Sequence, residues 1–217
     1  MKGMRATGLL EEKYDVRQFI QINHDALKTL ANSLKKSEDK LKVVKNVYRW
    51  NVENIYYPFR PDGKPAIGFT IKAFPWLIYG FFKLYLAEYE QEYAWLLPSQ
   101  LLKFKYGICI DTANLCTTLL RILSVDAYTV LGVVEGGGRF YGHAWTIAEA
   151  GGEWYLLETT IHKGRPPVLR LEEVDKNLRV KYIEVGRFNE SHVHVDRELW
   201  DKYNLTLSTI FRGVEFE

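Results

Sequence analysis

The stretch GICIDTANLCTTLL, residues 107–120, is followed by three short apolar runs: AYTVLGVV (127–134), YGHAWTIA (141–148) and EWYLLE (153–158). In the first stretch the apolar residues recur at helical intervals, which predicts a helix that begins near Cys109, after a break at Gly107. The three runs have the alternation of strands, and glycine-rich turns separate them. Residues 127–158 are therefore predicted to form an antiparallel meander.

Helical patterns also come before this stretch. Residues 9–34 carry apolar residues at helical spacing and are predicted to form a helix. An N-cap at Ser37, followed by acidic residues, predicts the start of a second helix that runs to about Ile55. Pro98 is expected to start a short third helix, and residues 179–186 a fourth strand. Helices first and strands afterwards indicate an α+β fold, in which the helix start at Cys109 faces a sheet built of hairpins.

Composition limits the classes of function. The 217 residues suffice for one sizeable domain, and we expect a single domain over residues 1–217. The formal net charge is only +2, and no run of five or more basic residues is present, so nucleic-acid binding is not predicted. The first residues lack the apolar stretch of a secretory signal, so a cytoplasmic location is expected. The oligomeric state stays open.

The two cysteines, Cys109 and Cys116, are not predicted to bridge each other. On one helix their Cα atoms would lie about 10 Å apart, whereas a disulfide needs less than ~7 Å. Two free thiols fit a reducing compartment, and their spacing makes a poor zinc site. His192 and His194 would share a face of a strand, but no third ligand is visible nearby. Neither a metal nor another cofactor is therefore predicted.

Residues 66–95 are unusually rich in aromatic side chains, and the part from 71 to 87 is nearly apolar. Lys72 and Lys83 interrupt this part, so no uncharged run approaches the ~18–20 residues that a membrane span requires. We expect a helix that packs over the core or lines a groove. A helix lying on a membrane surface, with its lysines reaching towards water, is the alternative.

Three residues have the chemistry of a nucleophile, a base and an orienting acid. A helix N-terminus and a nearby imidazolium both favour a thiolate, and Cys109 sits at a predicted helix start. His143 lies within the second predicted strand and Glu158 ends the third, eight and seven positions from the turn at Gly151. They are therefore expected to be cross-strand neighbours, so that the carboxylate orients the ring. Taken singly, each residue has a more common structural explanation, such as burial or solvation.

The local sequences resemble a known family. Lys105-Tyr106-Gly107-Ile108-Cys109-Ile110-Asp111 closely resembles the nucleophile helix of the transglutaminase-like superfamily of papain-like cysteine enzymes. His143-Ala144-Trp145 resembles its His-x-Trp strand, and Trp154 to Thr160 resembles its third motif, a tryptophan a few residues before an acid and a threonine. Tyr48-Arg49-Trp50 with Asn54-Ile55-x-Tyr57, and Tyr93-x-Trp95-x-x-Pro98, are similar to segments that precede the cysteine motif in microbial members. The resemblance covers roughly residues 45–160, with an insertion at about 60–92 and a C-terminal extension at about 161–217.

The resemblance implies a papain-like core in which Cys109 is the nucleophile, His143 the base and Glu158 the residue that holds the base. It also implies acyl transfer on a peptide or protein amide through a thioester. Hydrolysis is the preferred outcome, with true cross-linking or non-catalytic peptide binding as alternatives. The family's acid is usually an aspartate that is often followed by proline, whereas here Glu158 precedes Thr159.

The groups that would stabilise an oxyanion are only partly indicated. The resemblance implies that the backbone N–H of Cys109 is one donor, as a helix N-terminus permits. The second donor is left open among Gln100, Trp95 and Trp76. Cys116 is expected to point into the core, two turns along from Cys109.

Overall fold

The computed structural model describes residues 3–8, 12–57, 94–160, 168–178, 180–208, 211 and 214–216. The helices within these ranges are α1 (Asp25–Leu34), α2 (Lys40–Asn54), α3 (Pro98–Phe104), α4 (Cys109–Ile122), α5 (Val174–Leu178), α6 (Arg197–Lys202) and α7 (Asn204–Leu207). The strands are β1 (Met4–Thr7), β2 (Lys13–Asp15), β3 (Ala127–Gly136), β4 (Arg139–Ala150), β5 (Glu153–Leu157), β6 (Leu169–Arg170), β7 (Lys181–Phe188), β8 (Val193–Val195) and β9 (Glu215–Phe216).

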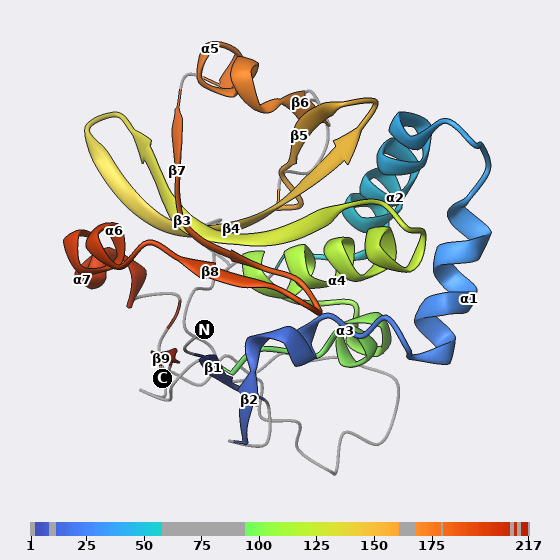
Figure 1. Cartoon of the computed structure of the whole chain (residues 1–217), viewed down its shortest axis with the longest axis horizontal. Coiled ribbons are helices and arrows are strands. Elements are labelled where there is room, and N and C mark those ends of the chain that lie inside the picture. Colours follow the sequence, from blue (N-terminus) through green and yellow to red (C-terminus); the bar gives the residue numbers. More distant parts are fainter. Residues whose placement is uncertain are drawn as a thin grey trace.

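The main sheet has six antiparallel strands in the order β6-β5-β4-β3-β7-β8 (Figure 1). Strand β3 pairs with β4 over its whole length, from Gly136 opposite Arg139 to Ala127 opposite Ala148, and β5 continues the meander on the far side of β4. The meander predicted for residues 127–158 is therefore confirmed. The predicted fourth strand is β7, which pairs with β3 rather than extending the meander at β5.

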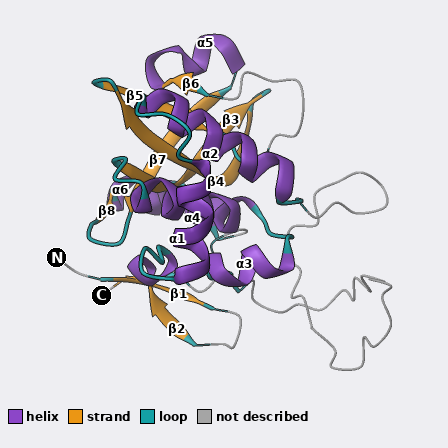
Figure 2. Ribbon diagram, turned by 90° about the vertical axis from the view of Figure 1, so that its right-hand side faces the viewer, coloured by secondary structure: helices purple, strands orange, loops and turns teal. Residues whose placement is uncertain are grey.

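Helix α4 packs against β3 and β4, and α1, α2 and α3 contact α4 in turn. Figure 2 shows α1, α2 and α4 gathered on one side of the strands. Their apolar side chains form a continuous buried core, to which α4 contributes Leu115, Cys116, Leu119 and Leu120. The predicted α+β fold, with the Cys109 helix packed on an antiparallel sheet and further helices at the N-terminal side, is confirmed.

Buried hydroxyl groups fix α4 relative to the sheet. Thr146 on β4 donates to the carbonyl of Ala113 over 3.0 Å, and Thr129 on β3 donates to the hydroxyl of Thr117 over 2.9 Å. A buried hydroxyl without a partner is costly, so these contacts favour one register of α4 on the two strands. The position of the first turn of α4 is thereby tied to that of β4.

The helix predicted for residues 9–34 is wrong in its first half. Residues 13–15 form β2, which pairs with β1, and Val16–Phe19 form a 3₁₀ turn, so only α1 is helical as expected. Val16 and Phe19 are both fully buried, and a spacing of three suits a 3₁₀ turn as well as an α-helix. Asp15 caps the turn by accepting the backbone N–H of Arg17.

The start of α2 also differs slightly from the prediction. Its N-cap is Asp39, whose carboxylate accepts the N–H groups of Leu41 and Lys42, whereas Ser37 accepts the N–H of Asp39. Both residue types favour an N-cap, and the aspartate takes the place next to the first helical turn. Ile55 lies just beyond the end of α2, and it is buried as its place in the apolar pattern suggests.

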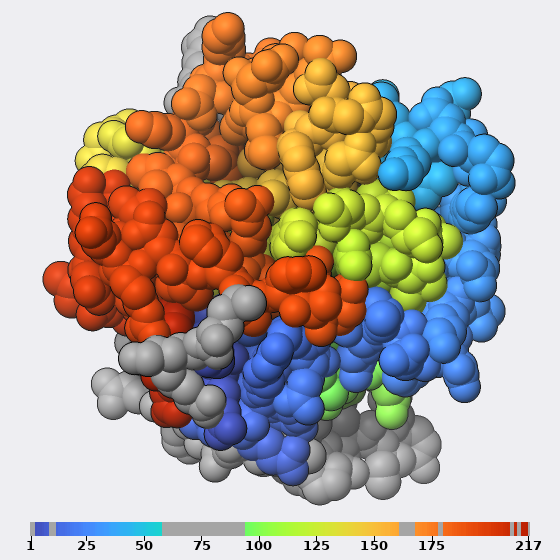
Figure 3. Space-filling model, in the orientation of Figure 1, coloured from blue at the N-terminus to red at the C-terminus, as the bar shows by residue number. Residues whose placement is uncertain are grey.

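A second, small sheet joins the two ends of the described chain in the order β2-β1-β9. N-terminal and C-terminal segments accordingly lie next to each other on the face shown in Figure 3, in blue and in orange to red. Residues 58–93 lie outside the described part of the chain, and with them the aromatic part at 71–87, the whole insertion expected at 60–92, and Trp76. Among the helices of the described ranges, none has the length and apolar character needed to cross a bilayer.

Candidate active site

The first turn of α4 is held by Asp111. Its carboxylate accepts the N–H of Ile108, the N-cap residue, over 3.0 Å and the N–H of Leu96 over 2.8 Å. Through these two bonds the fully buried Asp111 caps the helix and also ties the segment before α3 to the helix start.

The break at Gly107 has a steric cause. A Cβ atom at this position would lie 2.6 Å from Cδ1 of Leu101 and 2.8 Å from Cβ of Asp111. Real Cβ atoms do not approach other atoms so closely, so only glycine lets α3 and the start of α4 pack at this distance. Cys109 follows as the first residue of α4.

The structure brings His143 and Glu158 together, with Nε2 of the ring 2.7 Å from Oε2 of the carboxylate. The pairing of β4 with β5 ends at Thr146 opposite Leu157, so the next position, Glu158, would face Trp145. His143 is two residues further along the same face of β4 and is a diagonal neighbour of Glu158 rather than its direct partner. A glutamate has the length to span this diagonal.

Glu158 accepts hydrogen bonds at both carboxylate oxygens. Thr160 donates to Oε1 from its hydroxyl over 2.6 Å and from its backbone N–H over 3.1 Å, and Tyr182 donates to Oε2 over 2.7 Å. Its side chain is only 6% exposed. Burial alone would raise the pKa of Glu158, but the charge of His143 and the hydrogen bonds from His143, Thr160 and Tyr182 lower it to about 2. The carboxylate is therefore an anion at neutral pH.

His143 lies between this anion and Cys109. Burial alone would lower its pKa, but the charge of Glu158, together with hydrogen bonding to Cys109 and Glu158, raises the pKa well above 6.5. A carboxylate only accepts hydrogen bonds, so Nε2 must carry the proton that faces Glu158. Nδ1 is then the ring nitrogen available to Cys109. Trp145 stacks on the ring at a centroid distance of 6.2 Å and helps to hold its plane.

Both cysteines are free thiols, and both are fully buried. Cys116 lies in the core between α4, α1 and α2, as its position two turns from Cys109 predicted. Burial raises the pKa of Cys116 to about 12, so this thiol stays protonated. Cys109 belongs to a different buried cluster and is the cysteine that lies next to His143.

Of the candidates for a second oxyanion donor, Trp95 lies in the same buried cluster as Cys109, whereas Gln100 lies in α3. Gln100 accepts the N–H of Leu97 over 2.9 Å and so serves the start of α3. Trp95 is fully buried, with its ring against a group of aromatic side chains, Phe19, Phe188 and Phe211. Trp76 is outside the described residues.

Tyr57, which sequence reasoning did not select as a site residue, lies beside Cys109. The backbone of Tyr56 pairs with the segment before α4, because its N–H donates to Lys105 and its carbonyl accepts the N–H of Gly107. The Tyr57 side chain packs on the cluster that contains Cys109, and its hydroxyl hydrogen-bonds the Cys109 backbone. Burial, followed by the charges of Cys109, Asp111 and Glu158, raises the pKa of Tyr57, so the phenol stays protonated.

Tyr182 was also missed. It lies on β7, and its ring packs edge-on against Trp145 at a centroid distance of 5.0 Å. Only the sheet order, with β7 next to β3, brings it to Glu158. The one usable signal in the sequence was the predicted fourth strand, and that prediction gave no partner for it.

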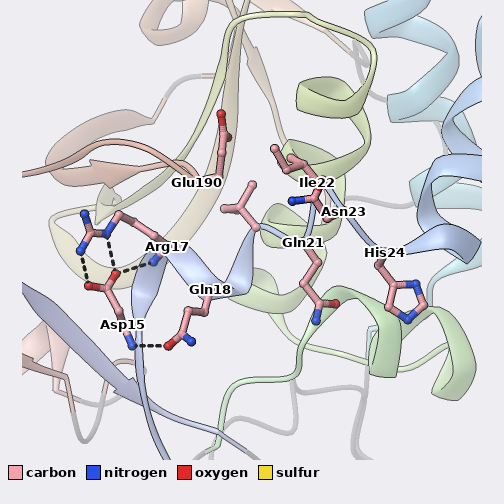
Figure 4. Close-up of a pocket in the computed structure, with 9 residues that line it drawn as sticks. Asp15, Arg17, Gln18, Gln21, Ile22, Asn23, His24 and Glu190 are labelled. Atoms are coloured by element: carbon pink, nitrogen blue, oxygen red, sulfur yellow. Dashed lines mark hydrogen bonds and ion pairs between the residues drawn. The ribbon is translucent and has the colours of Figure 1, made fainter.

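An open pocket of about 650 Å³ is lined by Asp15, Arg17, Gln18, Ile20, Gln21, Ile22, Asn23, His24 and Glu190 (Figure 4). None of the three predicted triad residues lines it. Its charged groups already have partners, since Asp15 pairs with Arg17 and Glu190 pairs with Arg121. The pocket therefore has no evident role in the chemistry of Cys109.

His192 and His194 do not form a metal site with a third ligand among the described residues, where no group of three His, Cys, Asp or Glu side chains is placed to hold an ion. His194 lies in β8, whereas His192 precedes the strand, and its Nδ1 is 2.8 Å from the hydroxyl of Ser191. Only one of the two histidines therefore lies in a strand, and the shared strand face expected for them does not form.

Comparisons with solved structures give distant similarities. A proposed cysteine protease of Cytophaga hutchinsonii has 17% identity and a TM-score of 0.45, over 82% of this chain and 52% of that one. A TGase has 16% identity and a TM-score of 0.41, over 65% and 33%. A proposed protease of Parabacteroides distasonis ATCC 8503 has 13% identity and a TM-score of 0.40, over 70% and 30%. The chain thus spans about half of the first protein and about a third of the others.

No curated protein matches the chain. The model of one protein family, described as a transglutaminase-like domain, matches residues 25–185. This range is more than half of the 217 residues and contains Cys109, His143 and Glu158. The chain therefore belongs to the transglutaminase-like domain family.

Proposed function

We propose that the protein catalyses thiol-dependent acyl transfer on a peptide or protein amide, with Cys109 as nucleophile, His143 as base and Glu158 as the orienting acid. The observation that carries this proposal is the position of His143, whose Nε2 contacts Glu158 while the ring lies close enough to Cys109 to hydrogen-bond it. A base held by a third group beside a nucleophile at a helix start is the arrangement that covalent catalysis requires.

In the first step Sγ of Cys109 attacks the amide carbon, and the electron pair of the C=O bond moves to the oxygen. When this intermediate collapses, the C–N bond breaks and His143 protonates the departing amine, leaving a thioester on Cys109. A second nucleophile then attacks the thioester, His143 takes its proton, and the thiolate leaves. The raised pKa of His143 supports this cycle, because it favours the imidazolium that pairs with a thiolate and donates to the amine.

Hydrolysis is the form of the reaction that we propose first. Water needs no binding site of its own, whereas cross-linking needs a second site that holds an amine against the thioester. A non-catalytic, peptide-binding role is the alternative from another class. It is disfavoured by Glu158, since a binding protein has no need to keep a buried anion against His143.

The experiment is to expose the protein to a peptide library and to follow Cys109 by mass spectrometry. A trapped acyl adduct on Cys109, absent in Cys109→Ala and retained in Cys116→Ala, supports acyl transfer. The products show whether water or an amine is the acceptor, because hydrolysis gives a free acid and cross-linking gives an isopeptide. Peptides that bind equally well to wild type and Cys109→Ala, with no adduct or product, would favour the binding role instead.

For the oxyanion we propose the backbone N–H of Cys109 together with the hydroxyl of Tyr57. In the resting structure the Tyr57 hydroxyl hydrogen-bonds the Cys109 backbone, so it is next to the position that a substrate oxygen must take. Once a carbonyl oxygen accepts the N–H of Cys109, the protonated phenol is free to donate to that same oxygen.

This assignment is tested with two small reagents. Acylation of Cys109 by p-nitrophenyl acetate passes through an oxyanion, whereas alkylation by iodoacetamide does not. Tyr57→Phe should lower the ratio of acylation rate to alkylation rate by about 10²-fold or more. Tyr56→Phe is the matched control, because Tyr56 is 54% exposed and its ring packs on Tyr106, away from the thiol. Equal ratios in wild type and Tyr57→Phe would rule out Tyr57 as a donor.

A further inference from the structure

Oε2 of Glu158 is shared between two side chains. Nε2 of His143 and the hydroxyl of Tyr182 each lie 2.7 Å from it, and they come from β4 and β7, the two strands on either side of β3. The Tyr182 ring is edge-on to both Trp145, at 5.0 Å, and His143, at 6.3 Å. The hydroxyl is therefore positioned by packing and aimed at the oxygen that His143 uses.

We propose that Tyr182 is a positioning residue for the proposed triad, and that it acts through Glu158. Its hydroxyl fixes the carboxylate in the orientation that meets Nε2 of His143, and it withdraws part of the negative charge of Oε2 from the ring. A role of Tyr182 in catalysis rests on the proposed function. Its control of His143 through Glu158 rests on the hydrogen bonds alone.

Two donors share the negative charge of Oε2. A hydrogen bond to a charged acceptor is short and about twice as strong as a neutral one, and it stabilises the anion. Without the Tyr182 hydroxyl, His143 would be the one described donor left on Oε2. The carboxylate becomes more basic, holds the imidazolium more strongly, and raises the pH at which His143 loses its proton. If the pKa of His143 were too high, the ring would stay protonated when it must act as a base.

Other titratable groups lie near the pair of His143 and Glu158. His143 faces Cys109 on α4 as well as Glu158, and the charge of Glu158 reaches the phenols of Tyr48 on α2 and Tyr57. Tyr48 donates to the backbone carbonyl of Glu158, not to its carboxylate. The described donors to the carboxylate are His143, Thr160 and Tyr182, and of these only Tyr182 shares Oε2 with His143.

The test measures the titration midpoint of His143 by NMR in the full chain. The chain has five histidines, so the signal is assigned by its loss in His143→Gln. Tyr182→Phe keeps the ring and removes the hydroxyl, and it should move the midpoint upward by about 0.5–1 unit. Tyr128→Phe is the matched control, because Tyr128 packs in the same cluster as Tyr182 but lies against Trp154 and Arg187. It should leave the midpoint unchanged.

A double-mutant cycle shows whether the effect passes through Glu158. In a Glu158→Gln background, Tyr182→Phe should no longer move the His143 midpoint, since the charge that it moderates is gone. A lower unfolding temperature with an unchanged midpoint would mean that Tyr182 is merely structural and would overturn the proposal. So would a shift that persists in the Glu158→Gln background.

The failure of this inference is distinguishable from that of the proposed function. Alkylation of Cys109 by iodoacetamide across pH provides the second readout, and its alkaline limb should move with the NMR midpoint in Tyr182→Phe. If no acyl adduct ever forms on Cys109, the proposed function fails while the NMR midpoint still decides the role of Tyr182.

Discussion

The hydroxyl of Thr112 lies 2.8 Å from the hydroxyl of Thr159, and the pair is buried. Thr112 also donates to the carbonyl of Cys109, and Thr159 directly follows Glu158. The contact thus joins the turn of α4 that carries the proposed nucleophile to the segment that carries the proposed acid. It gives a physical reason for the threonine that follows the acid in the third motif.

Thr159→Val should loosen this connection. The substitution keeps the shape of the side chain and leaves the Thr112 hydroxyl without its partner on Thr159, which should lower the free energy of unfolding by about 1–2 kcal/mol. Alkylation of Cys109 should slow as well, because His143 and the thiol are no longer held at a fixed separation. Thr118→Val is the control, since the buried Thr118 hydroxyl has no partner within the described ranges. A larger loss of stability in Thr118→Val than in Thr159→Val would contradict this explanation.

Glu158→Gln should change how stability depends on pH. The pKa of Glu158 is lowered from 4.5 to about 2, so its contribution is present above pH 4.5 and is lost as the pH falls towards 2. The contribution is on the order of 3 kcal/mol at neutral pH. The pKa of His143 is raised, so its contribution is present below 6.5 and is lost as the pH rises through the folded value. Urea unfolding from pH 2 to 9 should show both losses in wild type, and both should be smaller in the variant.

Native alkylation should distinguish the two thiols. Both thiols are buried, so their neighbours should decide their reactivity. The pKa of Cys116 is raised to about 12, so this thiol should resist iodoacetamide until the protein unfolds. Cys109 should react in the native state, because His143 lies beside it and can take its proton. Peptide mapping after labelling, with and without denaturant, measures both. Cys116→Ala should cost about 1–2 kcal/mol of stability and leave the labelling of Cys109 intact. Preferential native labelling of Cys116 would refute the assignment.

Asp111→Asn should destabilise the start of α4. The variant keeps one oxygen acceptor, but its NH₂ group would face either the N–H of Leu96 or that of Ile108. A buried donor facing a donor costs about 1–3 kcal/mol, which thermal or urea unfolding would show. Asp126→Asn is the comparison, because Asp126 is 49% exposed and pairs with Arg121 near the surface. It should cost at most a few tenths of a kcal/mol. Comparable losses in both variants would argue against the capping role.

Sequence patterns predicted the sheet and the helix start well, because those signals are local. The alternation in residues 127–158 and the glycine at 107 each reflect the backbone conformation of the residues next to them. Both were interpreted correctly. The first half of the 9–34 prediction failed because Val16 and Phe19 have a spacing that fits either a 3₁₀ turn or an α-helix. The choice between them depends on the small sheet in which β2 pairs with β1 and β1 with β9, and this sheet joins residues from both ends of the described chain.

The candidate site was predictable only where the chain's own turns bring residues together. His143 and Glu158 belong to consecutive strands, so counting from the turn placed them side by side, although as diagonal rather than direct neighbours. Tyr57 and Tyr182 reach the site from the end of α2 and from β7. Their approach depends on how helices and strands pack, and no periodic pattern in the sequence records it.

The segment between Tyr57 and Ala94 has both of its ends fastened at one place. Before it, Tyr56 pairs with Lys105 and Gly107, and after it, Leu96 is bound to Asp111. Both of these anchor points lie at the start of α4, next to Cys109. Doubling the length of a connection between two such points costs only about 0.6 kcal/mol in closure entropy. We therefore expect the described scaffold to tolerate changes in the number of residues between them.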